Sequence, residues 1–347
     1  MKKRLFVVLN PTQYLNAVEY VNATGSEKDY LAIMSFHMDR FEVLNNLGAG
    51  KFWYKKSFLD FSKIFNLNND NKFWNSSFSF LKDIHKRVLP DQLIVGNLID
   101  NLIYPFVLSV KNRHPTIVNL DDGTPTLNIA YNRLKSTYYK NYHVQNFKST
   151  FKKSIYLGLC PPLICPPKSI EFFTLFPLDL PLTDKKLTNN YKWSMSKVKP
   201  MPTTNEALFV GSHLVDRGIV HQNTYLSSLD YISKRAKAEG YKFVYVHHRG
   251  ESSDIRDKLT ALYPTIQYNL PLELAFIDSH RPAMFIGHFS SALFTLSRIY
   301  PNSKIKSYIF DDELILNTKF EPRDYTLRVQ QALVNDNMTE VIRHRIH

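Results

Sequence analysis

The sequence predicts an α/β protein built from two successive domains, each with a parallel sheet covered by helices. Three observations support this prediction. Apolar, strand-like runs alternate with helical patterns from residue 5 to residue 120, and the alternation restarts at residue 207. Residues 138–202, between the two halves, lack the alternation and are rich in lysine, aromatic residues and proline. At 347 residues, the chain also exceeds the roughly 250–300 residues at which a single core stops growing.

The first half is expected to contain four strands, with a helix behind each of the first three. After the first strand, Leu15, Val18 and Val21 fall on one face of a helix, which is the spacing of an amphipathic segment. The expected strands are residues 5–9, 30–36, 93–97 and 116–120, and the expected helices are residues 12–23, 40–47 and 102–110.

The second half is expected to alternate five strands with four helices. Gly240 suits a helix C-terminus, Ser252 or Ser253 suits a helix N-cap, and Pro271 suits a first helical turn. The expected strands are residues 207–211, 242–248, 265–269, 283–288 and 305–310, and the expected helices are residues 225–240, 252–263, 270–279 and 290–300.

These patterns predict two Rossmann-like domains, residues 1–190 and residues 203–347, joined by a linker within residues 184–202. The second domain is expected to end in a C-terminal helix. Two doubly wound sheets in succession form the architecture called GT-B, in which two Rossmann-like domains face each other across a cleft. Ligands of open α/β sheets bind at the carboxyl ends of the strands. The residues that directly follow each strand are therefore the candidates for function.

Composition excludes several classes of protein. Hydrophobic residues make up 44% of the chain, which excludes a disordered protein. The formal net charge of +13 favours acidic partners: nucleic acid, an anionic membrane or a negatively charged substrate. Nucleic acid is not expected as a partner, because the sequence contains no helix-turn-helix, zinc-finger or RNA-binding signature.

The chain is expected to be a cytoplasmic protein, and any contact with the bacterial inner membrane would have to be peripheral, on its inner face. The apolar run at residues 5–9 is too short for a signal peptide, and no window approaches ~20 apolar residues. Cys160 and Cys165 are expected to be reduced thiols, since two cysteines cannot complete a zinc site. Residues 135–156 mix lysines with aromatic residues, which suits either a lipid or glycan surface or a solvated helix.

Four strand ends carry side chains that could perform chemistry. Two adjacent acids follow the strand at residues 116–120, although a turn needs at most one acid as a helix cap. The other three strand ends lie in the second half and carry histidines, serines and an arginine. The four sets are Asp121, Asp122 and Gly123; Gly211, Ser212 and His213; His247, His248, Arg249 and Glu251; and His288, Phe289, Ser290 and Ser291.

Each candidate has a functional and a structural interpretation. One acid of the pair could act as a general base on a hydroxyl group, with its pKa raised by its neighbour, or it could cap the next helix. Ser290 and Ser291 could hold a phosphate at a helix N-terminus or serve as an ordinary cap. Glu273 could accept hydrogen bonds from a ribose or balance a helix dipole. The sequence contains no Asp-x-Asp, so no metal is expected.

Taken together, the motifs resemble those of the bacterial sialyltransferases of glycosyltransferase families 52, 80 and 38 and related capsule enzymes. The stretch "DDG" at 121–123 matches their acidic pair, "VHHRGE" at 246–251 is similar to their His-Pro motif, and "GHFSSALF" at 287–294 is similar to their Ser-Ser motif. The stretches "PTQYLNAVEYV" and "LFVGSHLVDRGIV" also resemble this group. Two departures are Arg249, where the family has proline, and Ser212-His213, where it has Gln-Pro.

The resemblance implies a metal-independent, inverting transfer of a nonulosonic acid, most often N-acetylneuraminic acid, from its CMP donor to a glycan acceptor of a capsule or lipooligosaccharide. No cofactor is implied. Asp122 would be the base, with Asp121 as the alternate, and His248 would act on the departing phosphate. The other residues implied to bind the donor are Gly123, Gly211, Ser212, His247, Arg249, Glu273, Ser290 and Ser291.

Two other readings remain open at this stage. One is a GT-B transferase that uses another nucleotide sugar, namely CMP-pseudaminic acid, CMP-Kdo or a UDP-sugar. The other is an inactive relative that only binds glycans or partners. The intact acidic pair, histidine and serine pair argue against the inactive relative.

Overall fold

The computed structural model describes the chain except for residues 66–69, 111–115, 136–166, 319–322, 337–338 and 344–347. The chain divides into two compact units, Met1–Trp193 and Ser194–His347, which are called the first and second units below. The boundary falls inside helix α7 (Lys192–Lys197). Cys160, Cys165 and nearly all of the segment rich in lysine and aromatic residues lie outside the described residues.

The first unit contains one sheet whose strands all pair in parallel, in the order β3-β2-β1-β4-β5-β6-β7. The strand order therefore runs outward in both directions from β1 and β4, as in a doubly wound sheet. The strands are β1 (Lys3–Val8), β2 (Lys28–Ser35), β3 (Lys55–Asp60), β4 (Gln92–Val95), β5 (Thr116–Leu120), β6 (Ile170–Thr174) and β7 (Lys185–Thr188).

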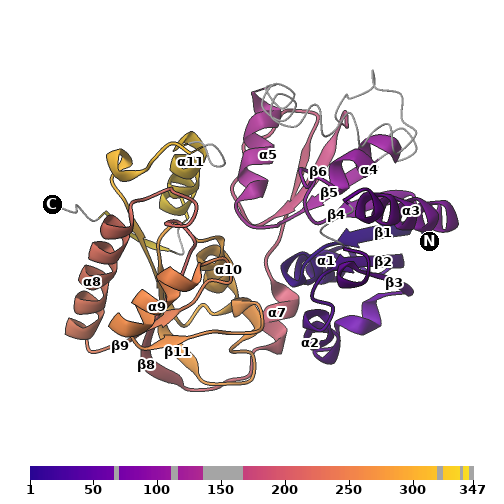
Figure 1. The fold of residues 1–347 in the computed structure, drawn as a ribbon. Helices are drawn as coiled ribbons and strands as arrows, with labels where there is room; N and C mark the ends of the chain where they lie inside the picture. The colour runs from indigo at the N-terminus through magenta and orange to yellow at the C-terminus, as the bar shows by residue number, and fades with distance from the viewer. Residues whose placement is uncertain (66–69, 111–115, 136–166, 319–322, 337–338, 344–347) are drawn as a thin grey trace. The chain divides into compact units, whose positions relative to one another are not determined.

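Helices cover both faces of the first sheet, because successive strand residues point to opposite sides. Leu5 and Val7 of β1 share a core cluster with Leu81 of α3, whereas Phe6 packs edge-on against Tyr20 of α1 at 6.0 Å. Figure 1 shows β1 between α3 and α1. The helices are α1 (Pro11–Thr24), α2 (Arg40–Asn46), α3 (Asp70–Val88), α4 (Ile103–Val110) and α5 (Pro125–Leu134), with 3-10 turns η1 (Ala49–Phe52) and η2 (Phe61–Lys63).

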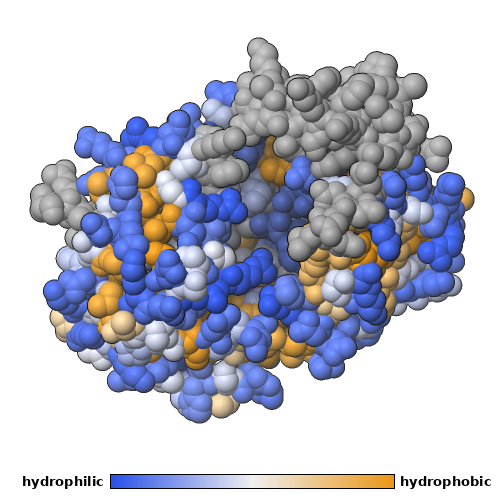
Figure 2. All heavy atoms as spheres, viewed as in Figure 1, coloured by the Kyte–Doolittle hydropathy of each residue, from blue (hydrophilic) through white to orange (hydrophobic). Residues whose placement is uncertain are grey.

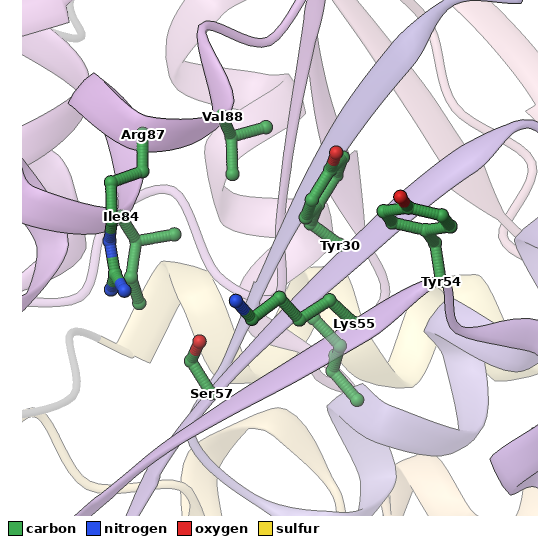
Figure 3. A pocket seen from close by; sticks show the side chains of 8 residues that line it. Tyr30, Tyr54, Lys55, Ser57, Ile84, Arg87 and Val88 are labelled. Carbon is green, nitrogen blue, oxygen red and sulfur yellow. The ribbon is translucent and has the colours of Figure 1, made fainter.

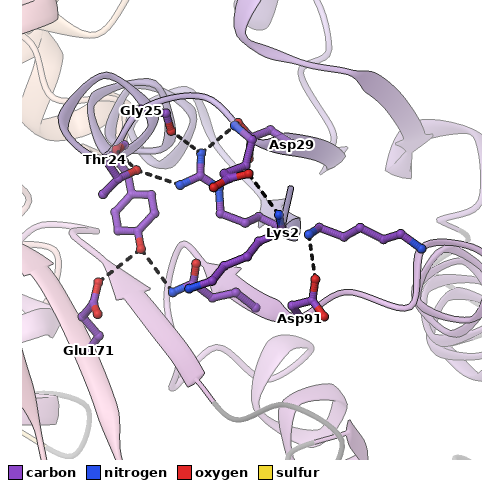
Figure 4. Close-up of polar contacts among 11 residues, drawn as sticks. Lys2, Thr24, Gly25, Asp29, Asp91 and Glu171 are labelled. Atoms are coloured by element: carbon purple, nitrogen blue, oxygen red, sulfur yellow. Dashed lines mark hydrogen bonds and ion pairs between the residues drawn. The ribbon is translucent and has the colours of Figure 1, made fainter.

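A buried ion pair joins the starts of β1 and β2. The guanidinium of Arg4 donates to both carboxylate oxygens of Asp29, at 2.5 and 2.8 Å, and also to the Thr24 hydroxyl and the Gly25 carbonyl at 2.7 Å each (Figure 4). Nearby, the Tyr20 hydroxyl donates to Glu171 at 3.2 Å. Arg4 and Asp29 are directly paired positions of β1 and β2, and breaking a buried pair would leave an uncompensated charge, so the pair favours this register.

The second unit repeats the architecture. Its strands also pair in parallel, in the order β10-β9-β8-β11-β12-β13. These strands are β8 (Thr203–Val210), β9 (Lys242–Val246), β10 (Thr265–Ile266), β11 (Arg281–Gly287), β12 (Lys304–Ile309) and β13 (Glu340–Arg343).

Both faces of the second sheet are covered as well. Phe209 shares one core cluster with Tyr225 and Leu229 of α8, whereas Phe285 packs on the opposite side against Phe276 and Tyr300 at 5.6 and 6.0 Å. The helices are α8 (Gln222–Ala238), α9 (Ser253–Leu262), α10 (Ser291–Ile299) and α11 (Arg323–Val334), with 3-10 turns η5 (Leu272–Leu274) and η6 (Asp312–Leu314).

The predicted fold class, an α/β protein with two Rossmann-like parallel sheets, is confirmed. The differences concern elements with weak sequence patterns. β6 and β7 lie where the alternation appeared lost, and Asp184, expected in the linker, forms a buried ion pair with Arg133 of α5. The short helix expected at residues 270–279 is only the 3-10 turn η5. β3, α3 and β13 were not predicted from the sequence.

In the described part of the chain, no helix is both long enough and apolar enough for a membrane span. Figure 2 shows hydrophilic side chains over most of the visible face, with smaller apolar patches among them. Most large apolar side chains in the described residues lie instead in the two cores.

Candidate active site

The strand order places a ligand-binding position in each unit. Open α/β sheets bind ligands outside the carboxyl ends of the strands, where the strand order reverses. In the first sheet the reversal lies between β1 and β4, and in the second sheet it lies between β8 and β11. All four strand ends singled out from the sequence follow a central strand: β5, β8, β9 or β11.

The carboxylate of Asp122 is held by two amides that follow the two strands at the reversal point. Asn10, just after β1, donates its side-chain amide to Oδ1 at 3.0 Å, and Asn97, just after β4, donates to Oδ2 at 3.0 Å. Each amide has its own oxygen engaged by backbone, since Asn10 Oδ1 accepts from Gln13 N and Asn97 Oδ1 accepts from Ile99 N. These bonds orient both NH₂ groups toward Asp122.

Burial raises the pKa of Asp122 above its usual value, and Asp100 raises it further. Hydrogen bonds from Asn10, Asn97 and Gln13 act in the opposite direction. The residue is nevertheless only half-buried, so a substrate can reach it. A carboxylate with a raised pKa that remains accessible and fixed in orientation has the properties of a general base.

Asp121, its neighbour, has a different environment. It is 2% exposed, its Oδ2 accepts a hydrogen bond from the Leu175 backbone N–H at 2.9 Å, and its carbonyl oxygen accepts one from Asn16 at 2.8 Å. Burial raises the pKa of Asp121 to about 7, although bonds from Thr174, Leu175 and Thr126 oppose the shift. Asp121 therefore ties the end of β5 to the end of β6.

Gly123 shapes the turn between β5 and α5. Its φ of 79° is in the left-handed region that side chains rarely adopt, and its carbonyl accepts from Thr126 N at 3.2 Å as α5 begins. Gly123, expected in the donor-binding set, thus has a backbone role that directs the chain away from Asp122.

In the second unit, His248 lies on the turn after β9 as a neutral imidazole. Its Nδ1 accepts from the Gly250 backbone N–H at 3.0 Å, and its ring stacks on His213 with centroids 4.5 Å apart. Burial lowers the pKa of His248 to about 4, and the neighbouring side chains of His213, Arg249, Arg217 and Arg256 lower it as well. Because Nδ1 is an acceptor, the ring proton is on Nε2, which is a hydrogen-bond donor at neutral pH.

His247 is used inside the unit. Its Nδ1 lies 3.1 Å from Glu251 Oε2 and its Nε2 lies 3.3 Å from the Thr260 hydroxyl. Glu251 in turn accepts from the buried Tyr245 hydroxyl at 2.6 Å, and burial raises the pKa of Glu251. His247 was expected from the sequence to bind the donor, but both of its ring nitrogens are engaged in this network.

Gly211 allows the ends of β8 and β9 to approach closely. A Cβ at this position would lie 2.4 Å from the Val246 carbonyl oxygen and 2.8 Å from Glu251 Oε1. Ser212, which follows, is half-buried, and Arg249 on the neighbouring turn is exposed. The glycine thus brings Ser212 next to the turn that carries His248 and Arg249.

Ser290 and Ser291 begin helix α10 after β11. Ser290 is the N-cap, with its Oγ accepting from Ala292 N at 3.3 Å, and Ser291 is the first helical residue. Both serines are half-buried. A helix N-terminus with free N–H groups and accessible hydroxyls is suited to binding an anion.

Glu273 packs against the same helix. Its Oε1 accepts from the Thr295 hydroxyl of α10 at 2.9 Å, and its carbonyl oxygen accepts from the Tyr300 hydroxyl at 2.8 Å. Burial raises the pKa of Glu273. This environment differs from the helix-dipole role considered from the sequence, because the carboxylate is fixed to α10 by a specific bond.

The described residues contain no group of three or more histidine, cysteine, aspartate or glutamate side chains arranged to hold a metal ion. Apart from Glu251, which is bonded to Tyr245 and His247, the polar groups at the ends of β8, β9 and β11 include an imidazole N–H, serine hydroxyls and the Arg249 guanidinium, all of which can donate. Such donors suit an anionic ligand.

No protein-family model and no curated protein matches the chain. Solved structures do resemble it. A UDP-GlcNAc 2-epimerase from Neisseria meningitidis bound to UDP-GlcNAc aligns with a TM-score of 0.54 at 12% identity, over 98% of this chain and 95% of that chain. The S. aureus MnaA–UDP complex gives 0.53 at 13% identity, over 97% and 89%.

An alpha/beta-galactoside alpha-2,3-sialyltransferase from the luminous marine bacterium Photobacterium phosphoreum is also similar. It aligns with a TM-score of 0.51 at 14% identity, over 98% of this chain and 99% of that chain. Identities this low establish the shared two-domain fold and nothing more specific. The fold is the GT-B type that glycosyltransferases and these epimerase-like proteins have in common.

Proposed function

We propose that the protein is an inverting, metal-independent sialyltransferase, which moves a nonulosonic acid from its CMP donor to a glycan acceptor. N-acetylneuraminic acid is the preferred candidate for the transferred sugar. The observation that carries the proposal is the clamped, half-buried carboxylate of Asp122 at the reversal point of the first sheet. The order of the three motifs along the chain and the shared fold with a bacterial sialyltransferase support it.

In the proposed reaction, a carboxylate oxygen of Asp122 takes the proton from the acceptor hydroxyl. The acceptor oxygen then forms a bond to the anomeric carbon of the donor while the bond from that carbon to the CMP phosphate oxygen breaks. The electron pair of the broken bond leaves with CMP, and a single displacement inverts the anomeric configuration. The reaction thus places one proton on Asp122 and one additional negative charge on the phosphate of the departing CMP.

The departing phosphate needs donors that are already in place. We assign this role to His248 Nε2–H and to the Ser290 and Ser291 end of α10. With a pKa of about 4, His248 acts as a hydrogen-bond donor in the free protein. The negative charge of the phosphate favours the protonated ring, so the pKa of His248 should rise as that charge develops, and the protonated ring would then donate a charge-assisted hydrogen bond to the phosphate.

A UDP-sugar transferase is the second candidate, because two structures of similar fold carry UDP or UDP-GlcNAc. CMP-pseudaminic acid and CMP-Kdo are further donors that the same residues would accept. The identity of the nucleotide released in a transfer assay separates these candidates.

The test uses purified protein, CMP-N-acetylneuraminic acid and a panel of galactosides in EDTA, with CMP release as the readout. We expect release by the wild-type protein and by Asp83→Ala, a control on the exposed face of α3, and loss in Asp122→Ala and His248→Ala. Release that survives Asp122→Ala but fails in Asp121→Ala would exchange the two roles. No release and no CMP binding would overturn the sialyltransferase assignment in favour of another nucleotide.

A further inference from the structure

A hollow of about 260 Å³ lies at the amino-terminal edge of the first sheet, at the opposite ends of the strands from Asp122. It is formed by the first residues of β2 and β3 and by the last turn of α3, and we call it the edge pocket (Figure 3). Its position separates it from every residue assigned above to the proposed reaction. Its volume lies just below the roughly 300–1,000 Å³ of drug-sized ligand sites, so its ligand is small.

Two cations and a hydroxyl converge in the edge pocket. In Figure 3 the ammonium group of Lys55 and the hydroxyl of Ser57 point toward the side formed by Arg87. Among the described residues, neither Lys55 nor Arg87 forms an ion pair, and the only hydrogen bond from Arg87 runs from Nε to the Asp83 carbonyl at 3.3 Å. Most of the donors of both side chains are therefore available to a ligand.

Structural roles explain each cation separately but not their convergence. Arg87 lies in the last turn of α3, where a positive charge is stabilised by the helix dipole. Lys55 begins an edge strand, where lysine discourages pairing with another chain. Neither role requires the two side chains to face one hollow together with a serine hydroxyl.

The other walls of the edge pocket are aromatic and aliphatic, which suits a ligand whose ring has one apolar face. Tyr30 and Tyr54 meet edge-on with their centroids 5.3 Å apart, and Tyr54 is 66% exposed. Ile84 and Val88 of α3 are buried and form an apolar lining. Ligand sites commonly combine such an apolar and aromatic lining with a few convergent polar groups.

We propose that the edge pocket binds a small acidic sugar, with its carboxylate or phosphate between Lys55 and Arg87 and its ring against the tyrosines. A guanidinium and an ammonium together match one anionic group, and the aromatic wall matches the apolar face of a sugar ring. This inference does not depend on the proposed transferase activity, because none of its residues takes part in that reaction.

The test is isothermal titration of the full chain with three probes: N-acetylneuraminic acid, glucose 6-phosphate and neutral N-acetylglucosamine. At least one acidic sugar is expected to bind the wild-type protein, and Lys55→Ala/Arg87→Ala is expected to weaken that binding roughly tenfold or more. Lys185→Ala is the matched control, because Lys185 is exposed and begins β7, the opposite edge strand of the same sheet.

Ring stacking is tested separately. Tyr54→Phe should retain binding and Tyr54→Ala should weaken it, with circular dichroism confirming that each variant is folded. The proposal is overturned if the neutral sugar binds as well as the acidic ones, if the double variant binds normally, or if no acidic sugar binds below about 10 mM. It is likewise overturned if only phosphatidylglycerol vesicles bind in a Lys55- and Arg87-dependent way, which would make this edge a membrane contact.

Discussion

At the scale of single residues, the two amides around Asp122 set how basic it is. Asn10→Ala or Asn97→Ala removes one bond that favours the ionised carboxylate, so the pKa of Asp122 should rise further. A hydrogen bond to a charged group contributes about 1.5–3 kcal/mol, which corresponds to roughly one to two pKa units. The acid limb of the pH–rate profile should therefore move upward, and the rate at neutral pH should fall.

The control for this experiment is Asn46→Ala, which removes an exposed amide from α2 in the same unit. Its pH–rate profile should match that of the wild type. A clamp variant that loses activity equally at every pH would contradict the argument, because it would indicate a lost geometry without a shifted pKa.

Asp121 is predicted to affect stability more than activity. Its pKa is raised to about 7, so the folded state holds a proton that the unfolded state releases near pH 4, and the contribution of Asp121 to stability declines as pH rises from about 4 to about 7. Asp121→Asn cannot titrate but can still accept from Leu175 N. The melting temperature of this variant relative to the wild type should rise across that interval and level off above it.

Transfer activity in the same variant tests whether Asp122, and not Asp121, is the general base. Asp121→Asn should retain turnover, whereas Asp122→Asn should lose it. The opposite pattern would mean that the buried acid, and not the accessible one, is the base.

His248 should titrate far below an ordinary histidine in the free protein. Its pKa is lowered to about 4 by burial and by neighbouring cations, so its ring resonances should not shift between pH 5 and pH 8 in an NMR titration. Saturating CMP should raise the pKa, since a phosphate stabilises the protonated ring. An unchanged pKa with CMP bound would show that His248 does not contact the phosphate.

At the scale of the elements, the sequence was most informative where a strand is buried on both faces. The strand predicted at residues 116–120 has the same bounds as β5, because Ile117, Val118 and Leu120 are apolar and a turn follows at once. β7 and β13 lie at sheet edges and carry mostly exposed or half-buried residues, so no apolar run marks them. The mixed polarity of β3, another edge strand, hid it in the same way.

The candidate site was predictable only in part for a related reason. Strand ends reveal acids, histidines and serines, but not which of them the fold buries. Asn10 was missed because an amide after a strand is ordinary, and its partner Asp122 is 112 residues away in the sequence. His247 and His248 are adjacent, yet one joins an internal network and the other does not. Only the turn geometry after β9 separates them.

The N-cap of α10 can be separated from its proposed anion site. Ser290→Ala should cost about 1 kcal/mol of stability, because alanine cannot accept from Ala292 N, whereas Ser290→Gly should cost only a few tenths. If the hydroxyl also donates to a phosphate, both variants should weaken CMP binding, measured by calorimetry, including the glycine variant of near-normal stability. Normal CMP binding in Ser290→Gly would mean that Ser290 only caps α10 and does not bind the phosphate.

At the scale of the whole molecule, each unit has its own sheet and its own core, so the two halves of the proposed chemistry can be separated. The proposed phosphate-binding groups, His248 and the start of α10, belong entirely to the second unit. A fragment of residues 194–347 should therefore fold, as judged by circular dichroism, and bind CMP within roughly tenfold of the affinity of the full chain.

Residues 1–193 alone should fold without binding CMP, because Asp122 and its amides are proposed to meet the acceptor. Neither fragment should transfer sugar by itself. If residues 194–347 fold but do not bind CMP, while the full chain does, the nucleotide site must include side chains from the first unit. If residues 1–193 bind CMP, the assignment of donor and acceptor to the two units is reversed, and Asp122 would then lie beside the nucleotide and could not serve as the base for an acceptor hydroxyl.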